Sequence, residues 1–312
     1  MSPGGSISLD NFIKSRMTKP LEISPNEYHS RLKVNRANIF DADSYLSKSV
    51  IWELKQASLY RWRNNPKTFA GSTAATWGTV VDCLVTTPDE LGDVVAISPF
   101  DSFRTKEAKE WKADQIEAGK TIMSKDVLIE AETAAGRLKE HHIAGDLIEN
   151  AQKQVVLLNK VKLPGCDEIN LKALVDLAPT SGSYLVDIKT TNTVTPLALS
   201  KKTAELGYHA QAGLYLKLWN LCFPDDQRDR FIFIWQCSEP PYEVCVSELP
   251  AADIHAGEEW IAFQLERLAK ATKTNTWPDP FQNKVAVIGR PEWAGYQDEE
   301  EYDGIIAAPA HC

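Results

Sequence analysis

The sequence contains no long apolar run. None of its 312 residues falls in an uninterrupted apolar stretch of the roughly 18–20 residues that a membrane-spanning helix needs. The opening segment, MSPGGSISLDNFIKSRM, also lacks the apolar stretch of a secretory signal peptide. We therefore expect a cytoplasmic protein with no membrane partner.

Cysteine pairs with metal-binding or redox spacing are absent as well. The six cysteines include no Cys-x-x-Cys pair and are scattered at positions 83, 166, 222, 237, 245 and 312. In a chain of this length, such scatter is typical of reduced, inert thiols rather than of disulfides or zinc ligands. The sequence also lacks a Gly-rich phosphate loop and a Gly-x-Ser-x-Gly turn, which argues against nucleotide-driven motors and the common serine hydrolases.

Positive charge is scarce. The chain has 34 Lys and Arg against 43 Asp and Glu, which gives a net charge of −9. A general polyanion binder would carry the opposite balance. Contact with nucleic acid therefore has to be local, for example in a basic groove, because charge attraction decays over about 8–10 Å in physiological salt.

Composition suggests three regions along the chain. The apolar fraction of 43% is ordinary for a globular protein. The first 45 residues are rich in Pro, Gly, Ser and Asn, so we expect a loosely ordered arm over 1–45. We expect one folded domain over 46–275, followed by an irregular acidic tail over 276–312.

Apolar spacing predicts several helices. A period near four is found over 44–65, 124–138, 201–221 and 251–271, with Ser124 placed to cap the second of these. The apolar run TWGTVVDCLVTTPDE fits either a strand or a buried helix, and periodicity does not decide between them.

Strand-like segments occur mostly in the second half of the chain. A run of three forms a predicted meander, and the last two of the three are separated by the turn signal Pro-Thr-Ser-Gly-Ser. Two more follow the helix predicted over 201–221. The five segments are QKQVVLLNKV, EINLKALVDLAP, SYLVDIKTT, RFIFIWQCS and YEVCVSEL.

Two acidic residues and a lysine form the strongest candidate for a site. Asp176 is followed after ten residues by Asp187-Ile188-Lys189, near the ends of neighbouring predicted strands. The strand period of two places Asp187 and Lys189 on one face and Ile188 on the other. Pairing of the hairpin would bring the two carboxylates together, where they repel unless a cation lies between them. Oxygen ligands favour Mg²⁺ or Mn²⁺, although the same residues could simply be surface groups of a hairpin.

These residues carry a family resemblance. Asp176-x10-Asp187-x-Lys189 resembles the PD-(D/E)xK nuclease motif, and VDIKTT followed by GYHAQAGLYL resembles the RecE-type (exonuclease VIII-like) phage recombination exonucleases. The second segment supplies Gln211 and Tyr215, four residues apart and so on one helix face. The resemblance spans about residues 43–220. It implies an α/β, restriction-endonuclease-like core with a central mixed sheet flanked by helices and an N-terminal helical extension.

The resemblance also implies roles for individual residues. The implied catalytic set is Asp176, Asp187, Lys189, Gln211 and Tyr215. The implied metal ligands are Asp82, Asp176, Asp187 and the carbonyl of Ile188, for Mg²⁺ with Mn²⁺ as a substitute.

Two positions depart from the RecE-type pattern. Asp82 stands where these proteins usually have His, and Gln154 stands near a position where many relatives carry Glu. Aspartate is a good ligand for a hard cation, so the first change should favour Mg²⁺ over softer metals. The second change removes a carboxylate. Together the two departures, at Asp82 and Gln154, keep a catalytically silent protein among the alternatives.

A weaker set of residues is expected to touch DNA. Arg61 and Arg63 flank an aromatic residue near the end of a predicted helix, where a solvated helix end explains them equally well. Thr190 and Thr191 directly follow the lysine, and His209 precedes the Gln-x-x-x-Tyr pair.

The implied function is Mg²⁺-dependent exonucleolytic hydrolysis of linear double-stranded DNA from 5′ to 3′, which leaves 3′ single strands for recombination. The implied partners are DNA ends, a phage single-strand annealing protein and further copies of the chain in a closed ring. Two alternatives stay open. One is a catalytically silent DNA-end-binding scaffold with a nuclease fold, and the other is a structure-specific endonuclease.

Overall fold

The computed structural model describes residues 13–14, 23, 25–65, 73–281 and 284–291. The chain divides into two compact units, Met1–Trp277 and Pro278–Cys312. All helices and strands found in the described residues belong to the first unit. The expected arm and tail lie partly outside the described residues, and the domain boundaries at 45/46 and 275/276 stay predictions.

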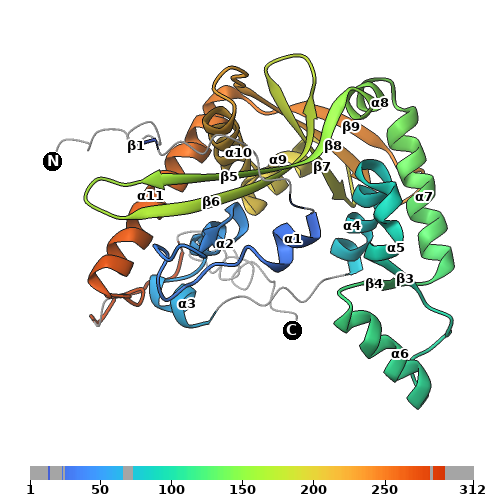
Figure 1. The fold of residues 1–312 in the computed structure, drawn as a ribbon, viewed down its shortest axis with the longest axis horizontal. Coiled ribbons are helices and arrows are strands. Elements are labelled where there is room, and N and C mark those ends of the chain that lie inside the picture. Colours follow the sequence, from blue (N-terminus) through green and yellow to red (C-terminus); the bar gives the residue numbers. More distant parts are fainter. Residues whose placement is uncertain (1–12, 15–22, 24, 66–72, 282–283, 292–312) are drawn as a thin grey trace, which may run out of the picture. The chain divides into compact units, whose positions relative to one another are not determined.

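A mixed sheet runs through the first unit (Figure 1). In the described residues it has seven strands, with the path β1-β5-β6-β7-β8-β9 and with β2 paired to β6. The β2–β6 and β7–β8 pairs are parallel and the other pairs are antiparallel. The strands are β1 (Ile13–Lys14), β2 (Tyr45–Leu46), β5 (Ala151–Lys162), β6 (Glu168–Pro179), β7 (Tyr184–Thr191), β8 (Arg230–Cys237) and β9 (Val244–Glu248). The predicted central mixed sheet is confirmed.

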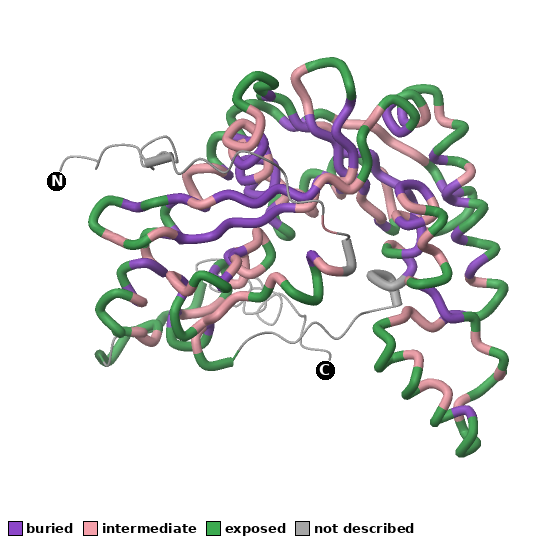
Figure 2. The backbone as a smooth tube through the Cα atoms, viewed as in Figure 1, coloured by how far each residue is buried: buried purple, intermediate pink, exposed green. Residues whose placement is uncertain are grey.

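Helices cover both faces of this sheet. One apolar cluster joins α10 and α11 to the N-terminal helices, and a second joins α4, α7 and α8. The buried stretches of β6, β7 and β8 lie between these two layers (Figure 2). The helices are α1 (Pro25–Ser30), α2 (Lys48–Trp52), α3 (Leu59–Asn64), α4 (Thr73–Thr86), α5 (Leu91–Val94), α6 (Lys106–Glu117), α7 (Lys125–Glu140), α8 (His142–Glu149), α9 (Pro196–Leu206), α10 (Tyr208–Cys222) and α11 (Ala251–Thr274).

Smaller elements complete the unit. Two short 3₁₀ turns occur at η2 (Glu53–Lys55) and η3 (Pro88–Glu90). A separate parallel pair of strands, β3 (Val95–Ile97) and β4 (Thr121–Met123), flanks α6. No helix in the described ranges combines the length and the apolar character needed to cross a membrane.

Two predicted helices are interrupted in the structure. The segment 44–65 forms β2, α2, η2 and α3 instead of one helix, and Ser58 caps α3 by accepting a hydrogen bond from the Arg61 N–H. The segment 201–221 breaks at Gly207, which has a φ of 68°. A Cβ at Gly207 would also run into the Trp52 ring, so both conformation and space favour glycine there. The ambiguous run at 76–90 forms most of α4.

Strand pairing is uneven at the centre of the sheet. β5 and β6 pair from Ala151↔Pro179 to Lys162↔Glu168, except at Gln154 and Asp176, and β7 and β8 pair along the whole length of β7. Between these two halves, the register contains one pair, Leu177↔Val186. The halves therefore separate beside this pair, at Asp176 on β6 and Asp187 on β7.

Candidate active site

Asp187 and Lys189 lie on the same face of β7, as their spacing predicts. Asp187 is 2% exposed and forms an ion pair with the Lys189 ammonium. The Gln211 amide on α10 donates a hydrogen bond to Asp187 Oδ1. Val186 and Ile188 point the other way, into the cluster formed with α4 and α7. A buried carboxylate is thus held by one cation and one amide.

Asp176 lies where β6 leaves β7. Its Oδ2 accepts a hydrogen bond from the Ile188 N–H at 2.9 Å, in the place of a ladder bond between the two strands. The N–H and C=O of one strand residue point toward the same neighbouring strand. The Ile188 carbonyl therefore faces β6 and Asp176, on the side where the strands part.

Asp82 reaches the site from α4 and is held by Gln154 of β5. The Gln154 amide donates to Asp82 Oδ2 at 3.0 Å and to Thr86 Oγ1 at 3.1 Å. Gln154 has a φ of 52°, an unfavourable conformation for a residue other than glycine. Asp82 Oδ1 is buried without a hydrogen-bond partner in the described structure. Gln154 therefore orients a carboxylate whose second oxygen remains available.

The three acidic residues affect one another's protonation. Burial, followed by the charge of Asp187, raises the pKa of Asp82 to about 7. Burial and the charges of Asp187 and Asp82 hold the pKa of Asp176 well above its usual value. Burial alone would lower the pKa of Lys189, but the charges of Asp187, Tyr208 and Asp176 outweigh it and raise this pKa. Negative charge is therefore in excess at the site.

This excess predicts a pH-dependent stability. An acid with a raised pKa in the folded state binds its proton more tightly there, so its ionisation destabilises the fold. In EDTA, the free energy of unfolding should fall between pH about 4 and about 7, and Asp82→Asn should flatten this fall. Denaturant titration of both proteins across this range tests the expectation. The control is Asp89→Asn, at an exposed position beyond the same helix. An equal dependence of the unfolding free energy on pH in the wild type and both variants would contradict the expectation.

The residues fit a hard divalent cation. The available donors are carboxylate oxygens and one backbone carbonyl, and the buried Asp82 Oδ1 lacks a partner in the described structure. The described side chains contain no ready cluster of three His, Cys, Asp or Glu in coordinating arrangement. One reason is that Lys189 and Gln211 occupy the oxygens of Asp187. A bound cation would have to compete with them for this carboxylate.

Two further residues at the site were missed by the sequence analysis. The Tyr208 ring at the start of α10 lies 4.8 Å from Lys189 Nζ and 5.6 Å from Lys48 Nζ, measured to its centroid. Burial and the nearby Lys189 charge lower the pKa of Lys48 to about 7. Tyr208 directly precedes His209 in the motif, which was a usable signal. Lys48 lies in an N-terminal helix with no comparable signal.

Tyr215 lies one helical turn beyond Gln211. Its hydroxyl hydrogen-bonds with the backbone of Leu174 on β6, and its ring packs edge-on against Phe231 at 6.3 Å. The structure therefore places Tyr208, rather than Tyr215, against the catalytic lysine candidate. Tyr215 therefore links α10 by a hydrogen bond to β6, the strand that contains Asp176.

Three expected DNA contacts lie close to the site but differ in exposure. Thr190 is half-buried and faces Gly78 of α4 closely. Thr191 is buried, and its hydroxyl accepts a hydrogen bond from the Lys202 ammonium at 2.6 Å. His209 is half-buried beside Trp52, with its Nδ1 3.4 Å from the Thr203 carbonyl. Of the two threonines, only Thr190 keeps a partly accessible side chain.

The basic residues of α3 divide into two kinds. Arg61 is exposed, whereas Arg63 lies over the Trp277 ring at 5.5 Å. Trp62 between them is fully buried and donates from its indole to the Val50 carbonyl at 2.9 Å, so it cannot stack on a base. Within the described residues, neither arginine forms an ion pair with the three acidic residues.

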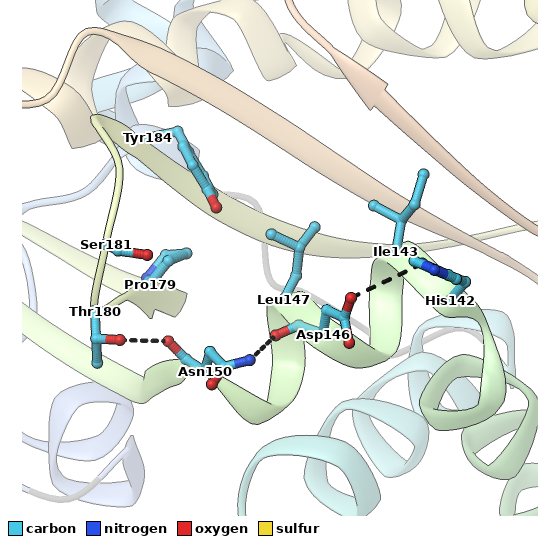
Figure 3. Close-up of a pocket in the computed structure, with 9 residues that line it drawn as sticks. All are labelled: His142, Ile143, Asp146, Leu147, Asn150, Pro179, Thr180, Ser181 and Tyr184. Atoms are coloured by element: carbon cyan, nitrogen blue, oxygen red, sulfur yellow. Dashed lines mark hydrogen bonds and ion pairs between the residues drawn. The ribbon is translucent and has the colours of Figure 1, made fainter.

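A pocket lies at another edge of the sheet, between α8 and the β6–β7 turn (Figure 3). Its volume is about 310 Å³. Its lining includes Asn150, Pro179, Thr180 and Tyr184 but none of the clustered acids. We therefore place the candidate active site at the parting of β6 and β7 and not in this pocket.

Fold and site together define a protein of the PD-(D/E)xK type: a mixed sheet between helices, with the acids and the lysine gathered where two central strands part. The chain belongs to the family described as "PDDEXK-like domain of unknown function (DUF3799)", whose model matches residues 60–285. No curated protein sequence matches it.

One solved structure supports the fold. A Eubacterium rectale protein described as a "Putative exonuclease" is 15% identical, with a TM-score of 0.57 over 87% of this chain and 96% of its own. A second structure, of SSO0001, is 19% identical with a TM-score of 0.29, over 65% of this chain and 77% of its own. The first likeness supports the fold, and the second is too low to carry an argument.

Proposed function

We propose that this protein is a metal-dependent deoxyribonuclease that hydrolyses linear double-stranded DNA from its ends. The observation that carries the proposal is the meeting of Asp82, Asp176 and Asp187 beside Lys189 at the split between β6 and β7. Three acids beside one lysine create a negative excess that a fold tolerates at a cost, and a cation-binding role accounts for it.

The proposed cofactor is Mg²⁺, with Mn²⁺ as a substitute. Asp82, Asp176, Asp187 and the Ile188 carbonyl would hold it, and when bound it supplies Lewis-acid activation of water and charge neutralisation at the phosphate. Gln154 and Gln211 orient two of these carboxylates through the hydrogen bonds described above. Such supporting partners fix the direction of a ligand's lone pairs.

Lys189 has two proposed tasks. In the absence of substrate, its ammonium neutralises Asp187. When a phosphodiester enters, the same ammonium donates to a phosphate oxygen or holds the attacking water in line. The Tyr208 ring limits where this ammonium can move, and Lys48 Nζ lies 5.6 Å from the centre of the same ring.

The substrate and polarity rest on the resemblance to RecE-type exonucleases. We propose linear duplex DNA degraded from 5′ to 3′, with 3′ single strands as the product for recombination. A single-strand annealing protein and a homo-oligomeric ring belong to the same proposal. The E. rectale neighbour, described as an exonuclease candidate, is consistent with cleavage from ends.

The alternative of a catalytically silent scaffold is motivated by the two departures from the RecE-type pattern, at Asp82 and Gln154. The geometry weakens this alternative, because Gln154 bonds to Asp82 and keeps a carboxylate in place. A structure-specific endonuclease is the other alternative.

One assay separates these three functions. A linear duplex and the same DNA as a covalently closed circle are incubated together with the protein in Mg²⁺. We expect loss of the linear DNA and survival of the circle, because an exonuclease needs an end. Cleavage of both would support an endonuclease, and stable binding of the linear form without cleavage would support a scaffold.

A further inference from the structure

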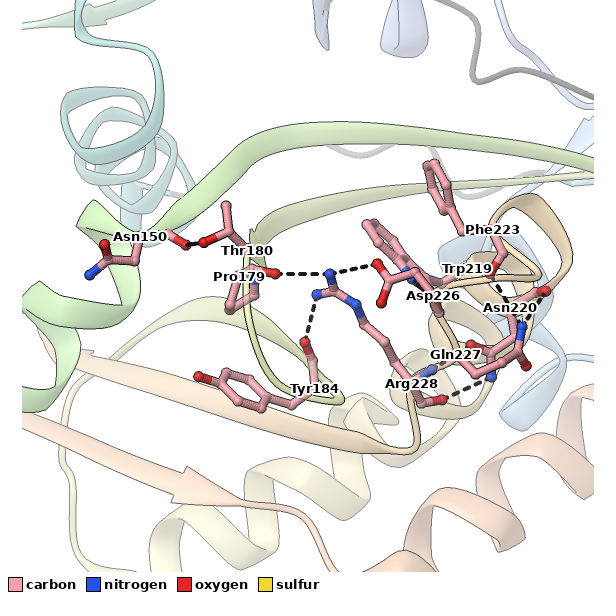
Figure 4. A network of polar contacts seen from close by, with 10 residues as sticks. All are labelled: Asn150, Pro179, Thr180, Tyr184, Trp219, Asn220, Phe223, Asp226, Gln227 and Arg228. Atoms are coloured by element: carbon pink, nitrogen blue, oxygen red, sulfur yellow. Dashed lines mark hydrogen bonds and ion pairs between the residues drawn. The ribbon is translucent and has the colours of Figure 1, made fainter.

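A buried arginine lies at the closed end of the hairpin that carries Asp176 and Asp187. Arg228 is 5% exposed and lies in the loop between α10 and β8 (Figure 4). One guanidinium nitrogen donates to the Tyr184 carbonyl at 2.8 Å. The other donates to the Pro179 carbonyl at 2.8 Å and to Asp226 at 3.0 Å. Pro179 ends β6 and Tyr184 begins β7, so Arg228 bridges the two strands.

This bridge lies where other links between the strands are few. The register between β6 and β7 contains Leu177↔Val186 alone, and the Asp176 carboxylate itself bonds to the Ile188 N–H. β6 is otherwise paired with β5, and β7 with β8. The sheet thus has two well-paired halves, one with β5 and β6 and one with β7 and β8, which are joined by few contacts. Arg228 belongs to the half that contains β8.

The two residues bridged by Arg228 lie at equal sequence distances from the two acidic residues. Pro179 is three residues from Asp176, and Tyr184 is three residues from Asp187. At about 3.3 Å per residue, the arginine clamps the hairpin roughly 10 Å from each carboxylate. Because these strand segments are short, a change in the β6–β7 distance at Arg228 should also change the distance between the two carboxylates.

The arginine itself is firmly held. Asn220 of α10 accepts from the Arg228 N–H at 2.7 Å and donates to its carbonyl at 2.8 Å. The guanidinium carbon lies 4.1 Å from the centre of the Trp219 ring, also on α10. Helix α10 carries Gln211 as well, so one helix positions both the clamp and the amide that holds Asp187.

We propose that Arg228 is a positioning residue that sets the separation of β6 and β7, and thereby the ability of Asp176 and Asp187 to bind one divalent cation together. This inference rests on the proposed metal-dependent function. A planar guanidinium reaches two carbonyls and a carboxylate at once, whereas a lysine ammonium is a single point donor on a flexible stem. Arg228→Lys therefore keeps the charge and loses the bridge.

The test is Mn²⁺ binding, which is measured by electron paramagnetic resonance at a temperature where each variant is folded. Loss of a supporting contact typically weakens metal affinity 10–100-fold, so Arg228→Lys should raise the Mn²⁺ dissociation constant by about tenfold or more. The matched control is Arg230→Lys, because Arg230 is exposed and its guanidinium donates to Glu248 on β9, while in the described structure it only lies over the Tyr184 ring at 5.7 Å and bridges no carbonyls of the hairpin. Arg228→Lys should need a higher Mn²⁺ concentration than the wild type for half-maximal activity. At saturating Mn²⁺, its turnover should approach the wild-type value.

The outcomes are distinct. An affinity in Arg228→Lys equal to that in Arg230→Lys would overturn the inference, even if the melting temperature fell. Absence of Mn²⁺ binding by the wild-type protein would instead contradict the proposed function. If Arg228→Lys does not fold, Asp226→Ala decides, since it removes the side-chain acceptor that helps to hold the guanidinium. It should weaken Mn²⁺ binding relative to Asp225→Ala, at an exposed neighbouring position, and equal affinities would overturn the inference.

Discussion

Asp187→Asn should lower the rate of DNA hydrolysis by about a thousandfold or more, because it removes the charge around which the site is organised. The substitution keeps the size of the side chain and an acceptor for the Gln211 amide. It removes the negative charge that pairs with Lys189 and that adds to the effect of burial in raising the pKa of Asp82 and of Asp176. The fold should persist, since the apolar clusters on both faces of β7 are unchanged.

The measurement is the initial rate of nucleotide release from linear duplex DNA in saturating Mg²⁺. Circular dichroism verifies the fold of the variant. Asp225→Asn, at an exposed loop position before β8, is the control and should keep the wild-type rate. More than a few percent of wild-type activity in Asp187→Asn would remove Asp187 from the proposed catalytic centre.

Lys189→Met should abolish hydrolysis to a similar degree and yet leave cation binding intact or tighter. The methionine side chain preserves much of the apolar stem but removes the ammonium that occupies Asp187. The negative excess of the site then increases, which favours a divalent cation. In EDTA the variant should be less stable than the wild type, because a buried carboxylate loses its partner.

Thermal unfolding with and without Mg²⁺ tests this expectation alongside the rate. The increase in melting temperature on adding Mg²⁺ should be larger in Lys189→Met than in the wild type. Lys201→Met, at an exposed position on α9, should behave as the wild type does. A rate near the wild-type value would show that Lys189 takes no part in the reaction.

The part of the site that follows from local rules was predictable from sequence. A strand period of two is enough to place Asp187 and Lys189 on one face, and a short turn is enough to bring Asp176 close. The helical period likewise places Gln211 and Tyr215 on one side of α10. Each of these relations spans few residues, so tertiary packing had little opportunity to alter them.

Relations between distant segments were not predictable in the same way. Asp82 and Gln154 are 72 residues apart, and their hydrogen bond depends on how α4 packs against β5. The backbone conformation of Gln154 has no signal in its residue type, because positive φ is rare outside glycine. Arg228 was also not recognisable, since its two carbonyl partners are fixed only by the sheet.

Packing also explains why one predicted helix is broken. The sequence 44–65 has helical spacing throughout, but the chain must turn so that Leu46 pairs with β6 while Trp62 packs in the core. Tertiary contacts outweigh helical propensity in such a segment. Gly207, by contrast, was a visible signal for the break between α9 and α10.

Metal-dependent cleavage is tested most directly by the release of nucleotides from an end-labelled linear duplex by the wild-type protein, measured in Mg²⁺ and in EDTA. We expect progressive release from the ends in Mg²⁺ and none in EDTA. Equal release in EDTA, or no release in either Mg²⁺ or Mn²⁺, would contradict a metal-dependent nuclease.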